Sequence, residues 1–595
     1  MPAERAALPP LPASRDGHTA ALAAAIAALA ACILYGPAVL APASVGWMLH
    51  GDPAQHLVGL AHFLAEPWHW PPGAIHHLAP ATSIVFTDSI PWLALALKAL
   101  HWPPAWQPFG LWLVLCHAAS AAFSALWLRR MGVGTLGASS AAVLLAFAPM
   151  VLLRTYGHES LLAHFLLPGA LLLAGRPWSR SSPWLWGGWL LLALGIHAYW
   201  VPMLLPWALA AAWQAWRQRR SSAARLLLQG GLIALALWAG AFLLGYGIGQ
   251  GQISAEGFGF YSANLLTWID PMDWPAFLAA YGRDPAQGAP WSRWWPALGQ
   301  STLGQYEGFA WLGSGILMLA ALCVLQALWQ ALRSMRHRPQ AAPAAPATQT
   351  NPSWPVPQAA PTFQPPWPGL WLGAGLLALL AFSPTWGWGA HTLVTWPLPE
   401  RVLHLLGVFR ASGRFIWPLS WLLALTLCAR VGRWRRGGIV LLLALVLQAA
   451  DLGPKLRELH TRFHHSMPDS AAPLRAPDWP ALLTRCPRLQ LLTADIQAGP
   501  QWAPPAWLAA QYGASVQPFP SARLNPAYQA AQAHHIAALA QGQGWDAHTL
   551  YLSWPGALDP SLPPRIGQQA QRQVHASTLQ LDGYTVWVPQ SCQPA

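Results

Sequence analysis

Four short polar stretches interrupt a largely apolar sequence, and two of them place a carboxylate ahead of an apolar helix. Residues 51–56 read Gly-Asp-Pro-Ala-Gln-His and lead into an amphipathic pattern suited to a helix in the membrane interface. Residues 83–91 place Asp88 ahead of an apolar run that is too short to cross a bilayer. Carboxylates at a membrane edge are costly and tend to mark function, so Asp52 and Asp88 are candidate catalytic groups.

Both carboxylates also have a purely structural interpretation. Asp52 occupies a predicted helix N-cap, followed by Pro53 at the first helical position and by Gln55, which completes a capping box. Asp88 precedes its own apolar run in the same way. Capping and catalysis can coexist at one residue, so the sequence leaves both interpretations open.

The third stretch, residues 154–159, contains a cation, a base and an acid: Arg154, His158 and Glu159. Together with His164 it reads His-Glu-x4-His, which differs from the zinc-protease pattern. Histidines six residues apart point about 120° away from each other on a helix, so they cannot share a metal as an i, i+4 pair does. Interfacial anchoring is the alternative role for His158 and Glu159.

The fourth stretch is Phe-Arg-Ala-Ser-Gly-Arg-Phe at residues 409–415, and it predicts two arginines on the outer side of the membrane. Planar guanidinium groups match phosphate oxygens, so Arg410 and Arg414 are candidates for binding a lipid phosphate. The alternative is a pair of arginines that snorkel to the interface.

The elements that must position these residues are those of a membrane protein. Of 595 residues, 54% are hydrophobic and 9% are charged, whereas a soluble domain carries about a quarter charged residues. Runs of about 20 apolar residues recur, and each is long enough to cross a hydrocarbon core of about 30 Å. The 39 Trp and 58 Pro suit interfacial aromatic belts and interrupted membrane helices.

The arginines beside these runs predict the orientation of the chain. Despite a net charge of +13, no basic stripe with interleaved aromatic residues occurs, so we expect no nucleic-acid partner. The arginines instead form short clusters of the kind found in cytoplasmic loops, at 129–130, 176–180, 217–225, 333–338 and 430–436. Placing every cluster inside predicts a mostly α protein of the inner membrane with about eleven spanning helices. The predicted spans are 19–41, 107–128, 134–152, 160–175, 184–199, 201–216, 226–248, 308–331, 369–388, 413–429 and 438–452.

The order and direction of the predicted spans also predict the domain organisation. The segment 19–41 is too long for a signal peptide and lacks a convincing cleavage site, so we interpret it as the first anchor. The predicted parts are a cytoplasmic N-terminus (1–18), a membrane domain (19–332) with external loops 42–106 and 249–307, a disordered Pro/Ala-rich cytoplasmic linker (333–367), further membrane helices (368–452) and a periplasmic α/β domain (453–595).

The C-terminal part reads as a small α/β domain. We expect strands at 489–492, 549–552 and 584–588 and a helix at 527–540. It lacks a Gly-rich phosphate loop and a GxSxG elbow. Its two cysteines, Cys486 and Cys592, can form a disulfide if the domain faces an oxidising periplasm.

Several of these stretches resemble an uncharacterised family of bacterial multi-spanning proteins, domain-of-unknown-function family 6311, which is similar to the GT-C glycosyltransferases. The resembling stretches are 51–56, 83–91, Gly157-His158, Asn264-Leu265-Leu266 and 409–415. They extend over most of the membrane part in the expected order, whereas the tail 453–595 matches little.

The resemblance implies a GT-C-like membrane fold and an inverting transfer of sugar from a polyprenyl-phosphate donor to an acceptor on the periplasmic face. By position it implies Asp52 as the catalytic carboxylate, with Glu159 as the second acid and Asp88 as a competitor. Arg410, Arg414 and Arg154 would stabilise the departing lipid phosphate, and His158 and His56 would orient either substrate.

Other partners and functions stay open at this point. Some GT-C members use a divalent metal, and the few carboxylates here do not require one. A lipid or glycan transporter, or a non-catalytic envelope assembly protein, is the alternative function, and the sequence leaves the sugar, the acceptor and the oligomeric state open.

Overall fold

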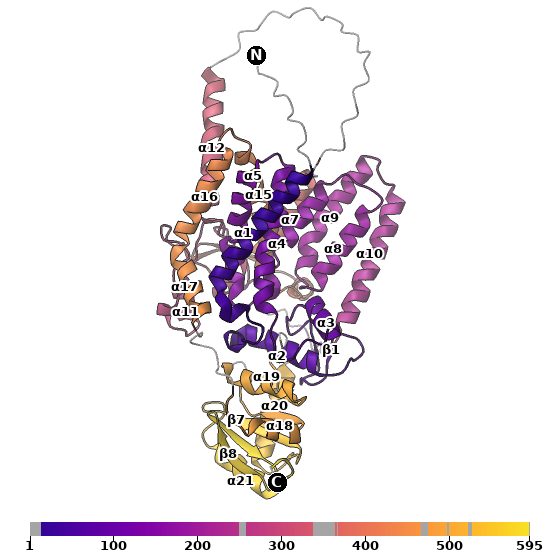
Figure 1. Cartoon of the computed structure of the whole chain (residues 1–595), viewed down its shortest axis with the longest axis vertical. Helices are drawn as coiled ribbons and strands as arrows, with labels where there is room; N and C mark the ends of the chain where they lie inside the picture. Colours follow the sequence, from indigo (N-terminus) through magenta and orange to yellow (C-terminus); the bar gives the residue numbers. More distant parts are fainter. Residues whose placement is uncertain are drawn as a thin grey trace, which may run out of the picture.

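Long runs of Ala, Leu and Trp form the helices that dominate the fold. The computed structural model describes residues 13–248, 257–336, 363, 365, 367–465, 474–496, 499–521 and 526–593. A bundle of helices occupies one end of the molecule, and a small domain with a β-sheet forms the other (Figure 1). The predicted linker 333–367 lies mostly outside the described residues.

The helices of the bundle follow the apolar runs of the sequence. They are α1 (Ala13–Leu40), α4 (Phe109–Arg130), α5 (Thr135–Ala146), α6 (Pro149–Leu152), α7 (Leu166–Gly175), α8 (Ser182–Leu194), α9 (Trp200–Arg217), α10 (Ala223–Leu244), α12 (Gly313–Arg336), α13 (Trp367–Phe382), α15 (Trp417–Gly432), α16 (Gly437–Asp451) and α17 (Gly453–His464). Each of the eleven predicted spans therefore contains a helix.

Fewer of these helices qualify as membrane spans than the sequence predicts. Among the described residues, six helical segments are long and apolar enough to cross a membrane, and a bent pair, α16 and α17, makes up to seven. The six are Arg15–Leu40, Phe109–Arg130, Thr135–Tyr156, Ala223–Leu244, Gly313–Met335 and Ser412–Gly432. The ten residues of α7 extend about 15 Å, half of a hydrocarbon core, so eleven spans are not confirmed.

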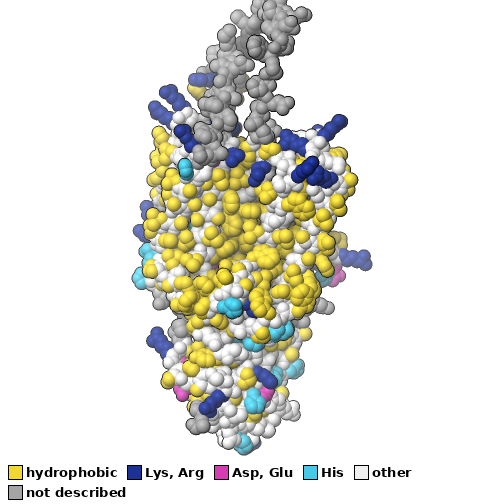
Figure 2. All heavy atoms as spheres, turned by 45° about the vertical axis from the view of Figure 1, so that its right-hand side comes forward, with side chains coloured by type: hydrophobic (Ala, Val, Ile, Leu, Met, Phe, Trp, Pro, Cys, Tyr) yellow, Lys and Arg dark blue, Asp and Glu magenta, His cyan; other side chains and the backbone are white. Residues whose placement is uncertain are grey.

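The surface of the bundle fits a multi-pass membrane protein. A broad apolar belt crosses the face seen in Figure 2, and Lys and Arg side chains crowd the end that lies away from the C-terminal domain. At this end Asp16, on α1, forms ion pairs of 3.2 Å with Arg129 and Arg130 at the end of α4. These contacts fix the first two spanning helices to each other.

The opposite end of the bundle holds the first long loop. Its elements are α2 (Gly51–Ala65), β1 (Ala74–Ile75), β2 (Thr82–Ser83) and α3 (Pro91–Ala99). The loop folds back onto α2, because the Ser89 hydroxyl donates to the His56 carbonyl at 2.7 Å. A Cβ atom on Gly59 would lie 2.3 Å from the Thr87 side chain, so this contact requires glycine. The two polar stretches of the loop are thus one packed unit.

The other segments at this end are short. They comprise the helix α11 (Trp274–Ala280), the hairpin of β3 (Thr385–Trp388) and β4 (His391–Thr395), and the helix α14 (Glu400–Gly407). Asn264 fastens the hairpin, because its side chain accepts from the Gly389 amide at 3.1 Å and donates to the Gly389 carbonyl at 2.9 Å. The Asn-Leu-Leu stretch thereby joins two segments that are 125 residues apart.

The C-terminal domain is built on a five-stranded mixed sheet. The strand order is β6-β5-β7-β9-β8, with β5 parallel to β6 and β7, and with β9 antiparallel to β7 and β8. The strands are β5 (Arg488–Leu491), β6 (Ser515–Gln517), β7 (Thr549–Ser553), β8 (Ser577–Leu581) and β9 (Tyr584–Val588), and the helices are α18 (Trp479–Arg485), α19 (Ala503–Gln511), α20 (Pro526–Ala540) and α21 (Leu562–Val574). The three predicted strands and the predicted helix are confirmed, and β6 and β8 are additional.

This domain docks directly on α2 and its loop. The buried His62 of α2 donates from Nε2 to the Ala506 carbonyl of α19 at 2.9 Å. The amide of Val516 in β6 donates to the His77 carbonyl at 2.7 Å, and the Phe519 amide donates to the Ala79 carbonyl at 2.8 Å. The first loop thereby extends the edge of the C-terminal sheet.

The pairing of Cys486 with Cys592 is confirmed as a disulfide, with 5.5 Å between the Cα atoms and 106 residues between the cysteines. Closing so long a loop restricts the unfolded chain, so replacing both cysteines by serine should destabilise the C-terminal domain by about 4–5 kcal/mol. Urea unfolding of the purified chain, followed by proteolytic release of the domain, measures this. The control replaces Cys323 by serine, and an equal midpoint for both variants would contradict the prediction.

Candidate functional site

A buried ion cluster lies at the end of the bundle that carries the first long loop. Arg154 Nη1 donates to Glu307 Oε2 at 2.7 Å, and Arg414 Nη2 donates to Glu307 Oε1 at 2.6 Å. The side chains of Arg154 and Glu307 are 1% and 5% exposed. Although burial alone raises the pKa of Glu307, the charges of Arg414 and Arg154 hold it well below its usual value. Glu307 is therefore an anion shared by two cations.

Two glycines let the segments of this cluster approach each other. Glu307 lies in a 3-10 turn, Leu303–Gly308, and Arg414 lies in another, Ser412–Ile416. A Cβ atom on Gly413 would lie 2.7 Å from the Gly308 backbone nitrogen, so no larger residue fits there. The Ser-Gly-Arg sequence thus brings the guanidinium of Arg414 against the carboxylate.

Aromatic rings cover the two guanidinium groups. The Arg414 guanidinium lies 4.8 Å from the centre of the Tyr199 ring, and that of Arg154 lies 4.9 Å from the Trp417 ring. The hydroxyl of Tyr199 accepts from the amide of Ala411 at 2.9 Å. These rings keep water from the ion pairs and fix the orientation of both arginines.

His158 connects the ion cluster to Asp52. Its Nε2 lies 3.6 Å from Asp52 Oδ2 and 4.0 Å from Glu307 Oε1. Burial, with the positive charges of Arg414 and Arg154, holds the pKa of His158 well below its usual value, so the imidazole is neutral.

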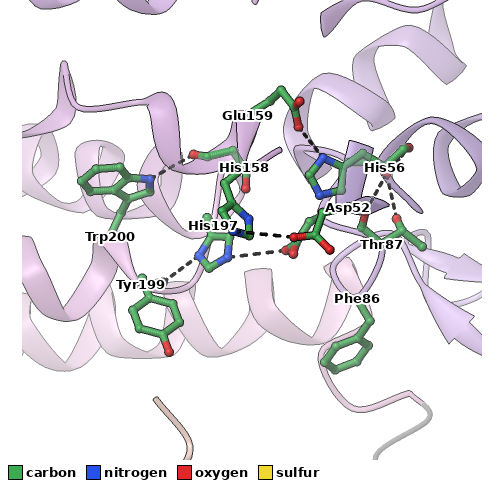
Figure 3. A network of polar contacts seen from close by, with 12 residues as sticks. Asp52, His56, Phe86, Thr87, His158, Glu159, His197, Tyr199 and Trp200 are labelled. Atoms are coloured by element: carbon green, nitrogen blue, oxygen red, sulfur yellow. Dashed lines mark hydrogen bonds and ion pairs between the residues drawn. The ribbon is translucent and has the colours of Figure 1, made fainter. Parts of the chain in front are cut away.

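Asp52 points toward His158 (Figure 3), and it is the accessible carboxylate of this group, with 62% of its side chain exposed. Protein on its other sides withholds water and raises the pKa of Asp52. The charge of His56 opposes this shift, and those of Asp88, Glu307 and Glu159 add to it. Three further carboxylates therefore act on Asp52 here.

Glu159 is buried behind His56. The distance from His56 Nδ1 to Glu159 Oε2 is 2.5 Å, and the side chains are 1% and 0% exposed. Although burial opposes it, Glu159 raises the pKa of His56. A buried carboxylate of this kind fixes the tautomer and orientation of an imidazole, and Glu159 itself is closed to a substrate.

Asp88 takes part in a second carboxylate–imidazole contact. Its Oδ1 lies 3.5 Å from Nε2 of His197, which is between α8 and α9. The Asp88 side chain is 26% exposed, and its backbone adopts a positive φ of 53°. Strained backbone of this kind is retained where surrounding contacts hold it in place.

The N-cap interpretation of the two carboxylates is wrong. Helix α2 begins at Gly51 with His50 as its N-cap, so Asp52 lies within the first turn. Gln55 donates to the Phe86 carbonyl and completes no capping box. The N-cap of α3 is Ile90, two residues after Asp88. Neither carboxylate is engaged in capping.

The predicted phosphate-binding residues separate into two environments. Arg154 and Arg414 are committed to Glu307, and His56 is committed to Glu159. Arg410 is exposed, with its guanidinium 5.7 Å from the Tyr261 ring, and among the described residues no carboxylate pairs with it.

The structure brings together all the predicted site residues except Arg410, which lies beside them: Asp52, His56, Asp88, Arg154, His158, Glu159 and Arg414. Sequence reasoning did not assign a site role to Glu307 or His197. The signal for Glu307 was the presence of two arginines, Arg154 and Arg414, outside the basic loops, because buried cations require an anion. His164 accepts a hydrogen bond from Trp421 Nε1 at 2.9 Å.

No group of three or more His, Cys, Asp or Glu side chains in the described ranges is arranged to hold a metal ion. The arrangement instead offers an exposed carboxylate, a neutral imidazole and two guanidinium groups that share one carboxylate. These are the components of proton abstraction beside an anionic group.

Replacing Glu307 by glutamine should destabilise the protein by about 3–5 kcal/mol, because two buried guanidinium groups lose their shared anion. The measurement is thermal unfolding of the detergent-solubilised chain. The matched control is Glu400→Gln, since the Glu400 side chain is 88% exposed and contacts His404 at 3.7 Å. Equal melting temperatures for the two variants would contradict the structural role of Glu307.

Comparison with known proteins assigns the chain to a family without supplying an activity. The search of curated proteins gave no match, and neither did the search of solved structures. The family described as a domain of unknown function, DUF6311, matches residues 24–453, and the DUF6311 C-terminal domain matches residues 478–589. Together the two matches cover most of the membrane part and the C-terminal sheet, so the chain belongs to the DUF6311 family.

Proposed function

We propose that this protein is a membrane glycosyltransferase that moves a sugar from a polyprenyl-phosphate donor to an acceptor hydroxyl. The observation that carries the proposal is the exposed Asp52 carboxylate, which lies 3.6 Å from a neutral imidazole at the edge of a buried, positively charged cluster. A base that is open to substrate and a cationic surrounding are what glycosyl transfer from a phosphate leaving group needs.

Asp52 acts as the general base in this proposal. Its carboxylate takes the proton of the acceptor hydroxyl while the acceptor oxygen bonds to the anomeric carbon. The bond between that carbon and the phosphate oxygen breaks, and the bonding electrons leave with the polyprenyl phosphate. Attack opposite the leaving group inverts the anomeric configuration.

The cations have different tasks. Arg410 is exposed and pairs with the departing phosphate, for which its planar guanidinium is suited. Arg154 and Arg414 are covered by rings and bound to Glu307, so they contribute through the field of one uncompensated positive charge. His158, which contacts both Asp52 and Glu307, holds the base in position.

The sidedness follows from the positive-inside rule. The arginine-rich end of the bundle is assigned to the cytoplasm, which puts Asp52 and the C-terminal domain on the periplasmic side of the inner membrane. The disulfide between Cys486 and Cys592 suits an oxidising compartment. Donor lipid enters from the outer leaflet, and the acceptor comes from the periplasm.

Replacing Asp52 by asparagine should lower sugar transfer by at least about a hundredfold, because general base catalysis contributes factors of about 10²–10⁴. Mass spectrometry of envelope glycans and polyprenyl-linked sugars measures this in a deletion strain rescued with each variant. The control is Asp284→Asn, since Asp284 is an exposed loop residue that only caps a short turn.

The two variants should be equally abundant in the membrane. Full rescue by Asp52→Asn would refute Asp52 as the base. A deletion that alters no glycan would refute the transferase proposal and favour transport or assembly.

Orientation is tested by adding single cysteines at exposed positions of the two ends. An impermeant maleimide should label Gln571→Cys, on α21, in intact cells and should label Arg435→Cys, between α15 and α16, only after the membrane is opened. The wild-type chain corrects for its own free thiols. Labelling of Arg435→Cys in intact cells would reverse the assigned orientation.

A further inference from the structure

Two loops converge on a small cavity at the arginine-rich end of the bundle, far from the candidate site. One loop joins α7 to α8 and the other joins α9 to α10. The cavity is lined by Arg176, Trp178, Gln214, Gln218 and Arg220, together with small apolar residues. Its volume of about 20 Å³ accommodates one water-sized group, such as an oxygen of a larger molecule.

The positive charge around this cavity is not neutralised by the protein. The two loops and their flanking helix ends carry six arginines, Arg176, Arg180, Arg217, Arg219, Arg220 and Arg225. The sequence from 160 to 255 contains no Asp or Glu, and none of the six arginines has an ion pair with a carboxylate in the described part of the chain. By contrast, Arg129 and Arg130 at the same end are paired with Asp16.

The cavity also contains a polar atom that has no partner. Gln214 Oε1 is buried and accepts no hydrogen bond within the described structure. An unsatisfied buried acceptor costs about 1–3 kcal/mol, so a ligand that donates a hydroxyl there is favoured. The lining therefore suits a ligand that presents a phosphate oxygen and a neighbouring hydroxyl group.

We propose that this cavity binds the headgroup of an anionic phospholipid that carries hydroxyl groups. Its phosphate lies between Arg176 and Arg220, and a headgroup hydroxyl donates to Gln214 Oε1. The position suits such a lipid, because the helices α7 to α10 present these loops at the end of the bundle away from the C-terminal domain (Figure 1), where Lys and Arg side chains lie beside the apolar surface (Figure 2). Trp178 contributes the aromatic ring that is common at this depth of a membrane protein.

The test is native mass spectrometry of the full chain in detergent, titrated with phosphatidylglycerol or with phosphatidylcholine. The wild type should retain phosphatidylglycerol preferentially. The double variant Arg176→Gln/Arg220→Gln should bind it about 25-fold more weakly, since each arginine near a lipid surface contributes about fivefold. The control is Arg435→Gln/Arg436→Gln, which removes equal charge from exposed residues between α15 and α16.

Equal weakening in both double variants would overturn the proposal, because binding would then depend on total charge alone. Equal retention of the two lipids by the wild type would also overturn it. Displacement of the lipid by inorganic phosphate alone would reassign the cavity to free phosphate. Gln214→Ala leaves the charge unchanged. It should weaken the binding of phosphatidylglycerol but not that of phosphatidylmethanol, an anionic phospholipid whose headgroup has no hydroxyl group.

Discussion

One carboxylate, Glu307, has to neutralise two buried guanidinium groups, and the geometry of the candidate site follows from that requirement. Arg154 and Arg414 lie 153 and 107 residues from Glu307 in the sequence, so three distant segments must meet at one point. The meeting point allows little variation, because the backbone at Gly413 touches that at Gly308 and rings cover both cations. The fixed positive charge then sets the surroundings of His158 and, through it, of Asp52.

Much of the architecture was predictable from hydropathy, and the number of spans was not. Every predicted span contains a helix, because apolar runs of this length fold as helices wherever water is scarce. Hydropathy does not distinguish a helix facing lipid from one facing protein. The segments Thr135–Tyr156 and Ala223–Leu244 are almost equally apolar, yet 89% and 11% of the residues in their most apolar stretches are buried within the protein. Short helices such as α7 pack among the others and are shorter than the length expected of a membrane-spanning helix.

The sequence predicted which residues of the candidate site lie near one another, but not which of them contact each other. Asp52, His158 and Glu159 lie together as the polar stretches suggested, because polar groups excluded from the bilayer collect at its edge. Their partners depend on contacts between segments far apart, which no local pattern encodes. The capping interpretation failed for a local reason, since Gly51 adopts a positive φ of 50° and His50, in place of Asp52, becomes the N-cap.

The docking of the C-terminal domain on α2 has a consequence for the order in which the protein folds during its synthesis. His62 and the Ala506 carbonyl to which it donates are 444 residues apart, so the helix that carries Asp52 and His56 leaves the ribosome long before its cover exists. The β-bridge from Leu78 to Val516 imposes the same order. The packing around helix α2 is therefore completed last, when the C-terminal domain has been made and docks on it. A chain interrupted before Ala506 would contain the residues of the candidate site but would lack the domain that packs on the helix carrying Asp52 and His56.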